Sequence, residues 1–307
     1  MKRRDFIFKS AGAGIVAGTA LSMGRLEKLL GNETVNTGLP YDLIAVKGGS
    51  APAMFDKAIA SMGGMTAFVK KNQTVVVKPN IGWDSTPERA ANTNPELVGR
   101  IVEQCFLAGA KSVYVFDNPV NEWTRCYKNS GIETAVKKAG GTMVSGKSQG
   151  YYHKVDIPNG KILKSASVHE LIIESDVFIN VPTLKTHGGT KLSISMKNLM
   201  GVVWDRGYWH HHNLHQCIAD FTTYRRPDLN VVDAFRVLKR NGPRGVSVAD
   251  VVEMKYQVIS PDIVAADAAA AKIFGIQPDQ LAHVPLAAKL GSGSDKLDSL
   301  KINRITM

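Results

Sequence analysis

The chain has 307 residues, of which 44% are hydrophobic and 21% charged, so it is long and apolar enough to bury a sizeable core. This composition excludes a disordered or fibrous protein. The formal net charge is +11, yet the sequence contains no long run of like charges. Nucleic-acid binders usually show a concentrated basic stripe and aromatic stacking platforms. We therefore expect a small anionic ligand, and no nucleic acid, as the partner.

Residues 1–22 are predicted to be a twin-arginine translocation signal. Arg3 and Arg4 are followed by an aromatic and an aliphatic residue, and then by a weakly apolar stretch at residues 11–21. That stretch is about half the roughly 20 residues that a spanning helix needs, so we expect no permanent membrane span. The pattern predicts export to the periplasm by the twin-arginine machinery. This route carries folded proteins, commonly with a cofactor bound, which favours a transition metal or metal-containing cofactor.

Residues 23–39 are polar and predict a linker, so the folded domain is expected at residues 40–307. Short apolar runs alternate in this domain with helical patterns, which is typical of a parallel sheet with helices on both faces. The predicted fold class is therefore α/β with a mostly parallel sheet. The predicted strands cover residues 42–46, 75–78, 112–116, 142–144, 177–181, 230–233, 256–260 and 301–305, and the predicted helices cover residues 52–62, 95–108, 132–139, 216–223, 263–274 and 281–291.

An irregular segment interrupts this alternation ahead of the strand at residues 177–181. Residues 153–157 alternate apolar and polar side chains, and the turn formed by residues 158–160 separates them from residues 161–165. We expect the two runs to pair as a small β-hairpin insertion near a sheet edge.

The three cysteines, Cys105, Cys126 and Cys217, are widely spaced. One disulfide is possible in an oxidising compartment, but an odd number cannot form a complete disulfide framework. Cys105 lies in a helical pattern and is expected to be a small core residue. No C-x-x-C motif occurs, so this chain alone cannot hold a four-cysteine iron-sulfur cluster.

The most informative stretch is residues 176–220, which opens with the apolar strand expected at residues 177–181. Pro182 ends that strand, and many cations and imidazoles follow it. Ligands of open α/β sheets bind at the carboxyl ends of the strands, so we expect a binding site here. The group comprises Lys185, His187, Lys191, Lys197, Asp205, Arg206, His210, His211, His212 and His215.

Three lysines of this group, Lys185, Lys191 and Lys197, flank the glycines at positions 188 and 189. Such a loop can bring cations and backbone N–H groups close to an anion. The alternative is a glycine turn between solvated lysines. Lys197 lies among apolar residues and is expected to be partly buried, which makes it a candidate base or cofactor attachment point.

We expect His187 and Lys197 to face one cleft at the carboxyl edge of the sheet. The direction of Lys197 depends on the structure of residues 191–200. A helix there would add the positive potential of its N-terminal amides. Apolar residues at positions 192, 194 and 196 instead indicate a strand, which would put Lys197 on the opposite face from them.

The histidines at positions 210–215 predict a metal site. On a helix, His211 and His215 would share one face, as would His212 and His215, and two imidazoles at such spacings can bind one metal ion. Asp205, Asp220 or Asp117, of which Asp117 directly follows a predicted strand, could add an oxygen ligand. The alternative is one or two histidines hydrogen-bonded in a cleft, with the others solvated.

Short motifs occur in a specific combination along residues 40–305: VVKPN at 76–80, NVPTLKTH at 180–187, MKNLMG at 196–201, IAD at 218–220, RPDLNVVD at 226–233 and NGP at 241–243. This combination resembles the domain-of-unknown-function family 362, which implies an α/β fold and no established reaction. Many relatives carry an added ferredoxin-like segment, which this chain lacks. A more remote similarity is to the nickel-pincer lactate racemases, in which a histidine precedes a cofactor-bearing lysine by ten residues, as His187 precedes Lys197.

These observations predict an exported, metal- or cofactor-dependent enzyme that transfers a proton or hydride on a small anionic substrate, as an oxidoreductase or isomerase. No P-loop, G-x-S-x-G or G-x-G-x-x-G motif occurs. One alternative is a non-enzymatic periplasmic protein that binds a metal or anion or serves a redox partner protein, and another is a scaffold. We expect His187, Lys197 and His215 as catalytic residues and Lys78, Asn80, Lys185, Lys191 and Asn198 as ligand-binding residues.

Overall fold

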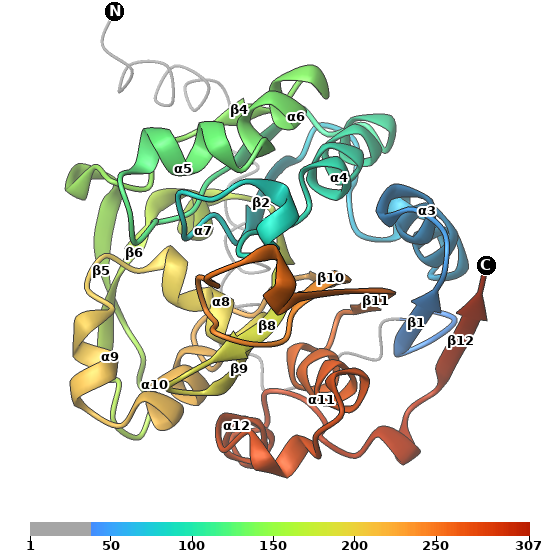
Figure 1. Ribbon diagram of the computed structural model, residues 1–307. Coiled ribbons are helices and arrows are strands. Elements are labelled where there is room, and N and C mark those ends of the chain that lie inside the picture. The colour runs from blue at the N-terminus through green and yellow to red at the C-terminus, as the bar shows by residue number, and fades with distance from the viewer. Residues whose placement is uncertain (1–37) are drawn as a thin grey trace, which may run out of the picture. The chain divides into compact units, whose positions relative to one another are not determined.

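The computed structural model describes residues 38–307 (Figure 1). The predicted signal at residues 1–22 and nearly all of the linker lie outside the described residues. Within residues 38–307, none of the helices combines the length and the apolar character that crossing a bilayer requires.

A ten-stranded mixed sheet forms the centre of the fold, and it confirms the predicted α/β class. Neighbouring strands run parallel from β10 through β7, β2 and β3 to β4, whereas β11 is antiparallel to both of its neighbours. The strands in sheet order are β12 (Ile302–Thr306), β1 (Leu43–Lys47), β11 (Val251–Ser260), β10 (Leu229–Leu238), β7 (Val177–Val181), β2 (Thr74–Pro79), β3 (Ser112–Val115) and β4 (Thr142–Met143), and β8 (Thr183–His187) pairs with β10 and with β9 (Lys191–Ser193).

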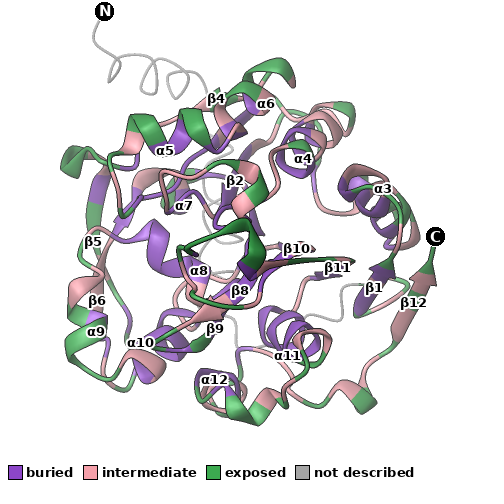
Figure 2. Ribbon diagram, in the orientation of Figure 1, coloured by how far each residue is buried: buried purple, intermediate pink, exposed green. Residues whose placement is uncertain are grey.

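Helices cover both faces of the sheet because its central strands are buried on both sides. In β2, Val75 and Val77 belong to the core on one face, whereas Val76 belongs to the core on the other. Figure 2 shows the buried surfaces of the helices turned toward the sheet. The first face carries α3 (Ala51–Ser61), α4 (Pro95–Leu107), α5 (Trp123–Asn129) and α6 (Ile132–Lys138), and the second carries α7 (Glu170–Glu174), α8 (Ser195–Asn198), α9 (Gly207–His211), α10 (Leu214–Phe221), α11 (Ile263–Phe274) and α12 (His283–Lys289).

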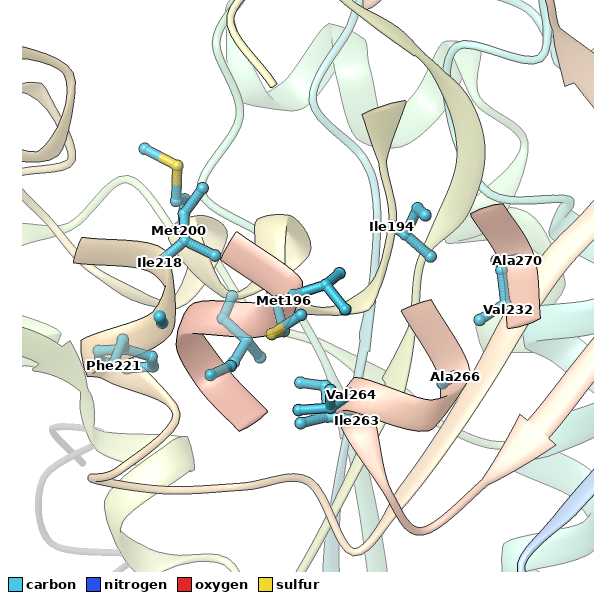
Figure 3. Close-up of a cluster of buried hydrophobic side chains, with 14 of the residues drawn as sticks. Ile194, Met196, Met200, Ile218, Phe221, Val232, Ile263, Val264, Ala266 and Ala270 are labelled. Atoms are coloured by element: carbon cyan, nitrogen blue, oxygen red, sulfur yellow. The ribbon is translucent and has the colours of Figure 1, made fainter. Parts of the chain in front are cut away.

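Helix α11 explains how the second face is packed. Its run of alanines lets the helix lie close to the sheet, and Figure 3 shows Ala266 and Ala270 near Val232 of β10. Met196 of α8 joins the same apolar cluster. The short helix α8 is therefore packed against the core on one side.

Single 3-10 turns complete the structure at Met65–Ala67, Pro87–Arg89, Gln149–Tyr151, Leu199–Val202, Val248–Asp250, Pro278–Gln280 and Leu297–Ser299.

The small hairpin is present, but its second strand lies further along the chain than predicted. Strand β5 (Tyr152–Asp156) pairs with β6 (Ser165–His169). The second strand of the hairpin therefore begins at Ser165, the residue at which the predicted strand ended. The carboxylate of Asp220 accepts hydrogen bonds from the amides of Ile162 and Leu163, at 2.7 and 2.9 Å. These amides are therefore engaged by α10 and cannot pair with β5.

Strand β7 ends at Val181, before Pro182, as the sequence predicted, but the chain stays in the sheet after this proline. It continues directly into β8, which pairs with β10, and turns back as β9 before α8 begins. Residues 191–200 thus form first a strand and then a helix, which reconciles the two alternatives that the sequence left open. This strand pair carries the cations of the stretch to the carboxyl edge of the sheet.

Candidate functional site

A cavity of about 270 Å³ opens at the carboxyl ends of β2 and β3, beside β8 and α8. Seven residues that the sequence analysis predicted as catalytic, ligand-binding or metal-binding line it: Lys78, Asn80, Asp117, Lys185, His187, Lys197 and Asn198. The other lining residues are Gly82, Trp83, Val120, Ser193, Met200, Gly201, Arg206, His210 and Pro243. Residues distant in sequence converge here because parallel strands end at the same edge of the sheet.

An ion pair between Lys78 and Asp117 forms the floor of this cavity. The lysine Nζ lies 3.0 Å from Oδ1 of Asp117, and both side chains are buried. Burial lowers the pKa of Lys78, and the neighbouring Asp117 acts against that shift. The carboxylate also accepts hydrogen bonds from the amides of Ile81 and Asn118, at 2.7 and 2.8 Å. Asp117 is therefore fully engaged and has a structural role.

Gly201 is needed for the approach of the chain to this ion pair. A Cβ atom at this position would lie 1.9 Å from Oδ1 of Asp117 and 2.6 Å from Nζ of Lys78. The Gly201 carbonyl also accepts a hydrogen bond from the amide of Asn118 at 3.1 Å. The last position of the MKNLMG motif is therefore glycine because there is no room for a side chain, a reason that sequence reasoning alone did not identify.

Asparagine side chains connect the ion pair to the sheet. Oδ1 of Asn198 accepts hydrogen bonds from Lys78 at 2.7 Å and from Asn80 at 3.1 Å. Its Nδ2 donates to Asn180 at 2.8 Å, and Asn180 donates to Asn230 at 3.0 Å. The predicted ligand residue Asn198 therefore fixes the orientation of Lys78. It is itself held by a buried network of uncharged asparagine side chains.

Lys185 is buried at the wall of the cavity without a carboxylate partner. Its Nζ donates to Oδ1 of Asn80 at 2.9 Å and to the carbonyl of Ala91. Burial, with a smaller contribution from the nearby Lys197, lowers the pKa of Lys185 to about 7. Its cationic form therefore titrates close to neutral pH.

Lys197 projects from α8 and forms neither a hydrogen bond nor an ion pair within residues 38–307. Burial lowers its pKa to about 8, and repulsion from Arg206 and Lys78 contributes. A lysine without partners at the wall of a cavity is available to a ligand. Of the residues in the cavity, Lys197 is thus the one most ready to bind an anion.

Arg206 is a cation of the cavity to which the sequence analysis gave no role. Its guanidinium donates to the carbonyls of Asn118 and Pro119, at 2.7 and 2.8 Å. Neutral carbonyls hold it in place and leave its charge uncompensated. Its position in the same dense stretch of cations was the signal that could have identified it.

His187 lines the cavity at the end of β8, and its ring is neutral. Nδ1 accepts a hydrogen bond from the amide of Gly189 at 3.0 Å, so the neutral ring carries its proton on Nε2. Burial lowers the pKa of His187 to about 3, with further contributions from Lys197 and Lys185. His187 can therefore donate a hydrogen bond without adding charge, and His210 also lines the cavity.

Within residues 38–307, the predicted metal ligands are not grouped around one position. Helix α9 ends at His211, and Asn213 adopts a left-handed conformation with φ of 68°, so no helix joins His211 to His215. Nδ1 of His212 bonds the Tyr208 carbonyl at 2.9 Å. Among the residues that the structure describes, no group of three or more His, Cys, Asp or Glu side chains is placed to hold a metal ion.

The remaining predicted residues lie away from the cavity. His215 faces His283, with the two Nδ1 atoms 3.3 Å apart, and does not line the cavity. Lys191 is exposed at the start of β9 and does not line the cavity. Cys105, Cys126 and Cys217 are all buried, and none of them is in a disulfide.

Comparisons with known proteins extend this description. A model of the family described as Domain of unknown function (DUF362) matches residues 75–272. The chain is 26% identical over 252 residues to the thylakoid-associated protein sll1697 of Synechocystis sp., which covers 79% of this chain and 76% of that protein.

Two solved structures are more distantly similar. The lactate racemase apoprotein of Thermoanaerobacterium thermosaccharolyticum matches 69% of this chain, with a TM-score of 0.43 and 13% identity. A protein from Thermotoga maritima matches 78% of this chain, with a TM-score of 0.42 and 8% identity. This chain spans only 53% and 58% of the length of those two proteins.

Proposed function

Because the chain belongs to the family described as Domain of unknown function (DUF362), a description that names no reaction, we propose a function from the chemistry of the cavity. The protein is an enzyme that binds a small organic dianion and moves a proton next to its anionic group. One observation carries this proposal. Lys185, Lys197 and Arg206 line one cavity, and none of them forms an ion pair within residues 38–307.

The balance of charge favours a dianion over a monoanion. Asp117 is the sole carboxylate among the residues that line the cavity, and Lys78 neutralises it. Three uncompensated cations remain when Lys185 is protonated. A dicarboxylate or a phosphate monoester would offset most of this repulsion, and it would gain charge-assisted hydrogen bonds. The apolar parts of such a ligand would contact Trp83, Val120, Met200 and Pro243.

The same residues supply groups for proton transfer. The pKa of Lys197, lowered to about 8, leaves part of the population as a neutral amine that can accept a proton near neutral pH. Nε2 of His187 carries a proton that can be donated to an oxygen on which negative charge develops. In this mechanism Arg206, Lys185 and the protonated form of Lys197 bind the anion. The neutral form of Lys197 is the base, and His187 is the hydrogen-bond donor.

The residues of the cavity fit some cofactors better than others. Its cations would repel a bare divalent metal ion, and its two imidazoles, His187 and His210, are too few to enclose one. An anionic organic cofactor that brings its own metal ligands would fit, with Lys197 and Arg206 binding its anionic groups. Such a cofactor would supply hydride or electron transfer, while the chain would bind and orient it.

Export remains part of the proposal and rests on the sequence of residues 1–22. The twin arginines Arg3 and Arg4 support transport to the periplasm by the twin-arginine route. Replacing both with lysine should stop export of the protein, as measured by cell fractionation. Undiminished export of the doubly substituted protein would contradict this prediction.

The proposed reaction is tested by hydrogen exchange. Small dicarboxylates would be incubated in D₂O with the purified protein, and exchange of the hydrogens next to the carboxylates would be followed by NMR. We expect exchange with the wild type and with Lys191→Met, whose lysine lies outside the cavity, and no exchange with Lys197→Met. Binding without exchange in the wild type would contradict the enzymatic role and favour an anion-binding protein.

A further inference from the structure

A second group of ionisable side chains lies behind α8, on the face of the sheet that α11 and α12 cover. Asp267 of α11 and His283 of α12 are both fully buried. Nε2 of His283 lies 3.8 Å from Oδ2 of Asp267 and has no hydrogen-bond partner among the described residues. Nδ1 of His283 faces Nδ1 of His215, which is partly exposed. The three side chains therefore form a row from the surface to the core.

Asp267 holds the start of the helix that carries Lys197 and Asn198. Its Oδ1 accepts a hydrogen bond from the amide of Ser195 at 2.6 Å, and its Oδ2 accepts one from the amide of Met196 at 3.2 Å. These are the first two residues of α8. The charge on Asp267 therefore controls the strength of the bonds that hold α8 in place, because an ionised carboxylate is the stronger acceptor.

The geometry of the two imidazoles identifies their contact as a hydrogen bond in which a proton can move. Their planes are within 10°, and the ring centroids are 5.5 Å apart. The two Nδ1 atoms are 3.3 Å apart, which is less than the separation of the ring centroids. The difference is about twice the radius of a five-membered ring, so both Nδ1 atoms lie on the line that joins the centroids. The rings are therefore head-on, with one Nδ1 donating to the other. Two ligands of one tetrahedral metal ion would instead point to a common third position.

We propose that His215, His283 and Asp267 form a proton pathway from the surface to α8, and that ionisation of Asp267 positions Lys197 in the cavity. The second part of this inference rests on the proposed function, and the first does not. Asp267 and His283 are then positioning residues, since neither lines the cavity.

Each step of the pathway balances. With Asp267 protonated, its Oδ2–H faces Nε2 of His283, and Nδ1–H of His283 donates to Nδ1 of His215. On ionisation, the proton of Asp267 moves to Nε2 of His283, and the proton on Nδ1 of His283 moves to Nδ1 of His215. His215 then releases its Nε2 proton to water. The buried Nε2 of His283, unsatisfied in this structure, gains a partner in both states.

The surroundings place this ionisation near neutral pH. Burial raises the pKa of Asp267 to about 7, while the two amides of α8 act in the opposite direction. Burial lowers the pKa of His283 to about 3, so its ring transmits a proton without remaining charged. The other charged groups that face the pathway are Asp262 near Asp267, Lys197 near His283 and Lys191 near His215.

The experiment measures amide hydrogen exchange at Ser195 and Met196 by NMR between pH 5.5 and 8.5, corrected for intrinsic rates. In the wild type we expect protection to rise about tenfold as pH increases through 7, because ionised Asp267 binds these amides more strongly. Asp267→Asn retains the size of the side chain and cannot ionise, so its protection should be low and independent of pH. A wild-type profile without a transition, or the same transition in Asp267→Asn, would overturn the proposal.

Two further variants test the histidines. His283→Leu replaces the imidazole that faces Asp267 with an apolar side chain, which disfavours ionised Asp267, so the transition should move upward by about one pH unit. His215→Phe should keep the midpoint but slow the exchange of protons, which would broaden the Met196 amide signal near pH 7. His212→Gln, whose ring lies outside the pathway, is the control and should behave like the wild type. An unchanged midpoint in His283→Leu, or a sharp signal in His215→Phe, would contradict the pathway.

The effect on the cavity is tested separately with sulfate as the probe. At pH 8, Asp267→Asn should bind sulfate about tenfold more weakly than the wild type, because α8 is held less firmly. Unchanged sulfate affinity in Asp267→Asn would overturn the positioning of Lys197. If the wild type does not bind sulfate at all while the amide transition is present, the proposed function fails and the proton pathway stands.

Discussion

The lysines and the histidines of residues 176–220 are placed differently in the structure. Lys185 and Lys197 both reach the cavity, together with Lys78 from a distant strand. The histidines at positions 211, 212 and 215 are as dense in the sequence, yet they face different surroundings. Lys78, Lys185 and Lys197 converge because strand ends and the adjoining α8 carry them to one edge of the sheet, whereas Lys191 remains exposed. The histidines diverge because their predicted convergence required one unbroken helix.

This difference shows which sequence patterns predict a site. Topology brings strand ends together whatever the details of the loops, so a polar residue that follows a buried strand is a reliable candidate. Helical spacing depends on every residue between the two ligands. Asn213 breaks the spacing here, because its backbone is left-handed. Its side-chain Oδ1 caps α10 by accepting a hydrogen bond from the amide of Gln216 at 3.1 Å.

The largest effect is expected where the lysine cluster is packed most tightly. Gly201→Ala would place a Cβ atom 1.9 Å from Oδ1 of Asp117, which forces the Lys78 ion pair apart. Breaking a buried ion pair costs about 3–5 kcal/mol, so the free energy of unfolding should fall by that order in urea denaturation. Gly188→Ala is the control, since its Cβ would meet no atom within 4 Å. Equal stability of the two variants would show that the packing around the ion pair is not essential.

A second prediction concerns the charge of the cluster. Sulfate does not titrate between pH 6 and 9, whereas the pKa values of Lys185 and Lys197, about 7 and about 8, lie in this interval. Each lysine loses its positive charge as pH rises through its pKa, so sulfate affinity should fall by at least about tenfold from pH 6 to pH 9. Isothermal titration calorimetry measures this change. An affinity that stays constant or rises would contradict the assignment of these lysines to the anion site.

A third prediction concerns the break between the histidines. Asn213→Ala should lower the free energy of unfolding by about 1–2 kcal/mol, because it removes the cap and strains the left-handed backbone. Asn213→Gly should lose less, since glycine adopts this conformation without strain. Thermal denaturation distinguishes the two. If alanine were tolerated as well as glycine, the left-handed conformation at Asn213 would not be what separates the histidines.

The smallest effect is expected at the exposed histidines themselves. His211→Gln should change both the free energy of unfolding and the affinity for sulfate only slightly, by about 0.5 kcal/mol or less, since the side chain lies at the surface and outside the cavity. Calorimetry and denaturation provide the measurement. A loss of sulfate affinity of tenfold or more would contradict this prediction and show that His211 takes part in anion binding.

Much of the fold could be predicted from local patterns, and the site only in part. Strands such as β2 and β7 are largely apolar runs with a proline at the end or directly after it, so the sequence predicted both strands and the polar residues that follow them. The second hairpin strand was misplaced because Asp220, far along the chain, binds the amides of Ile162 and Leu163. Such long-range contacts leave no local signal.

The same limit applies to the side chains of the site. The sequence placed Lys78, Lys185 and Lys197 near strand ends, but it could not show that Asp117 pairs with Lys78. Asp117 was therefore predicted as a metal ligand, although its oxygens are engaged by a lysine and by backbone amides. His283 was not noticed, because its partners Asp267 and His215 lie on other helices.

The central claim is that Lys197 is an available cation in an anion-binding cavity. Calorimetric titration of sulfate at pH 6.5 into the wild type, Lys197→Met and Lys191→Met tests it most directly, because both variants remove one positive charge and only Lys197 lines the cavity. A hydrogen bond to a charged group contributes about 1.5–3 kcal/mol, so Lys197→Met should weaken binding about 10- to 100-fold and Lys191→Met about twofold at most. Equal losses in the two variants, or no binding by the wild type, would contradict the account.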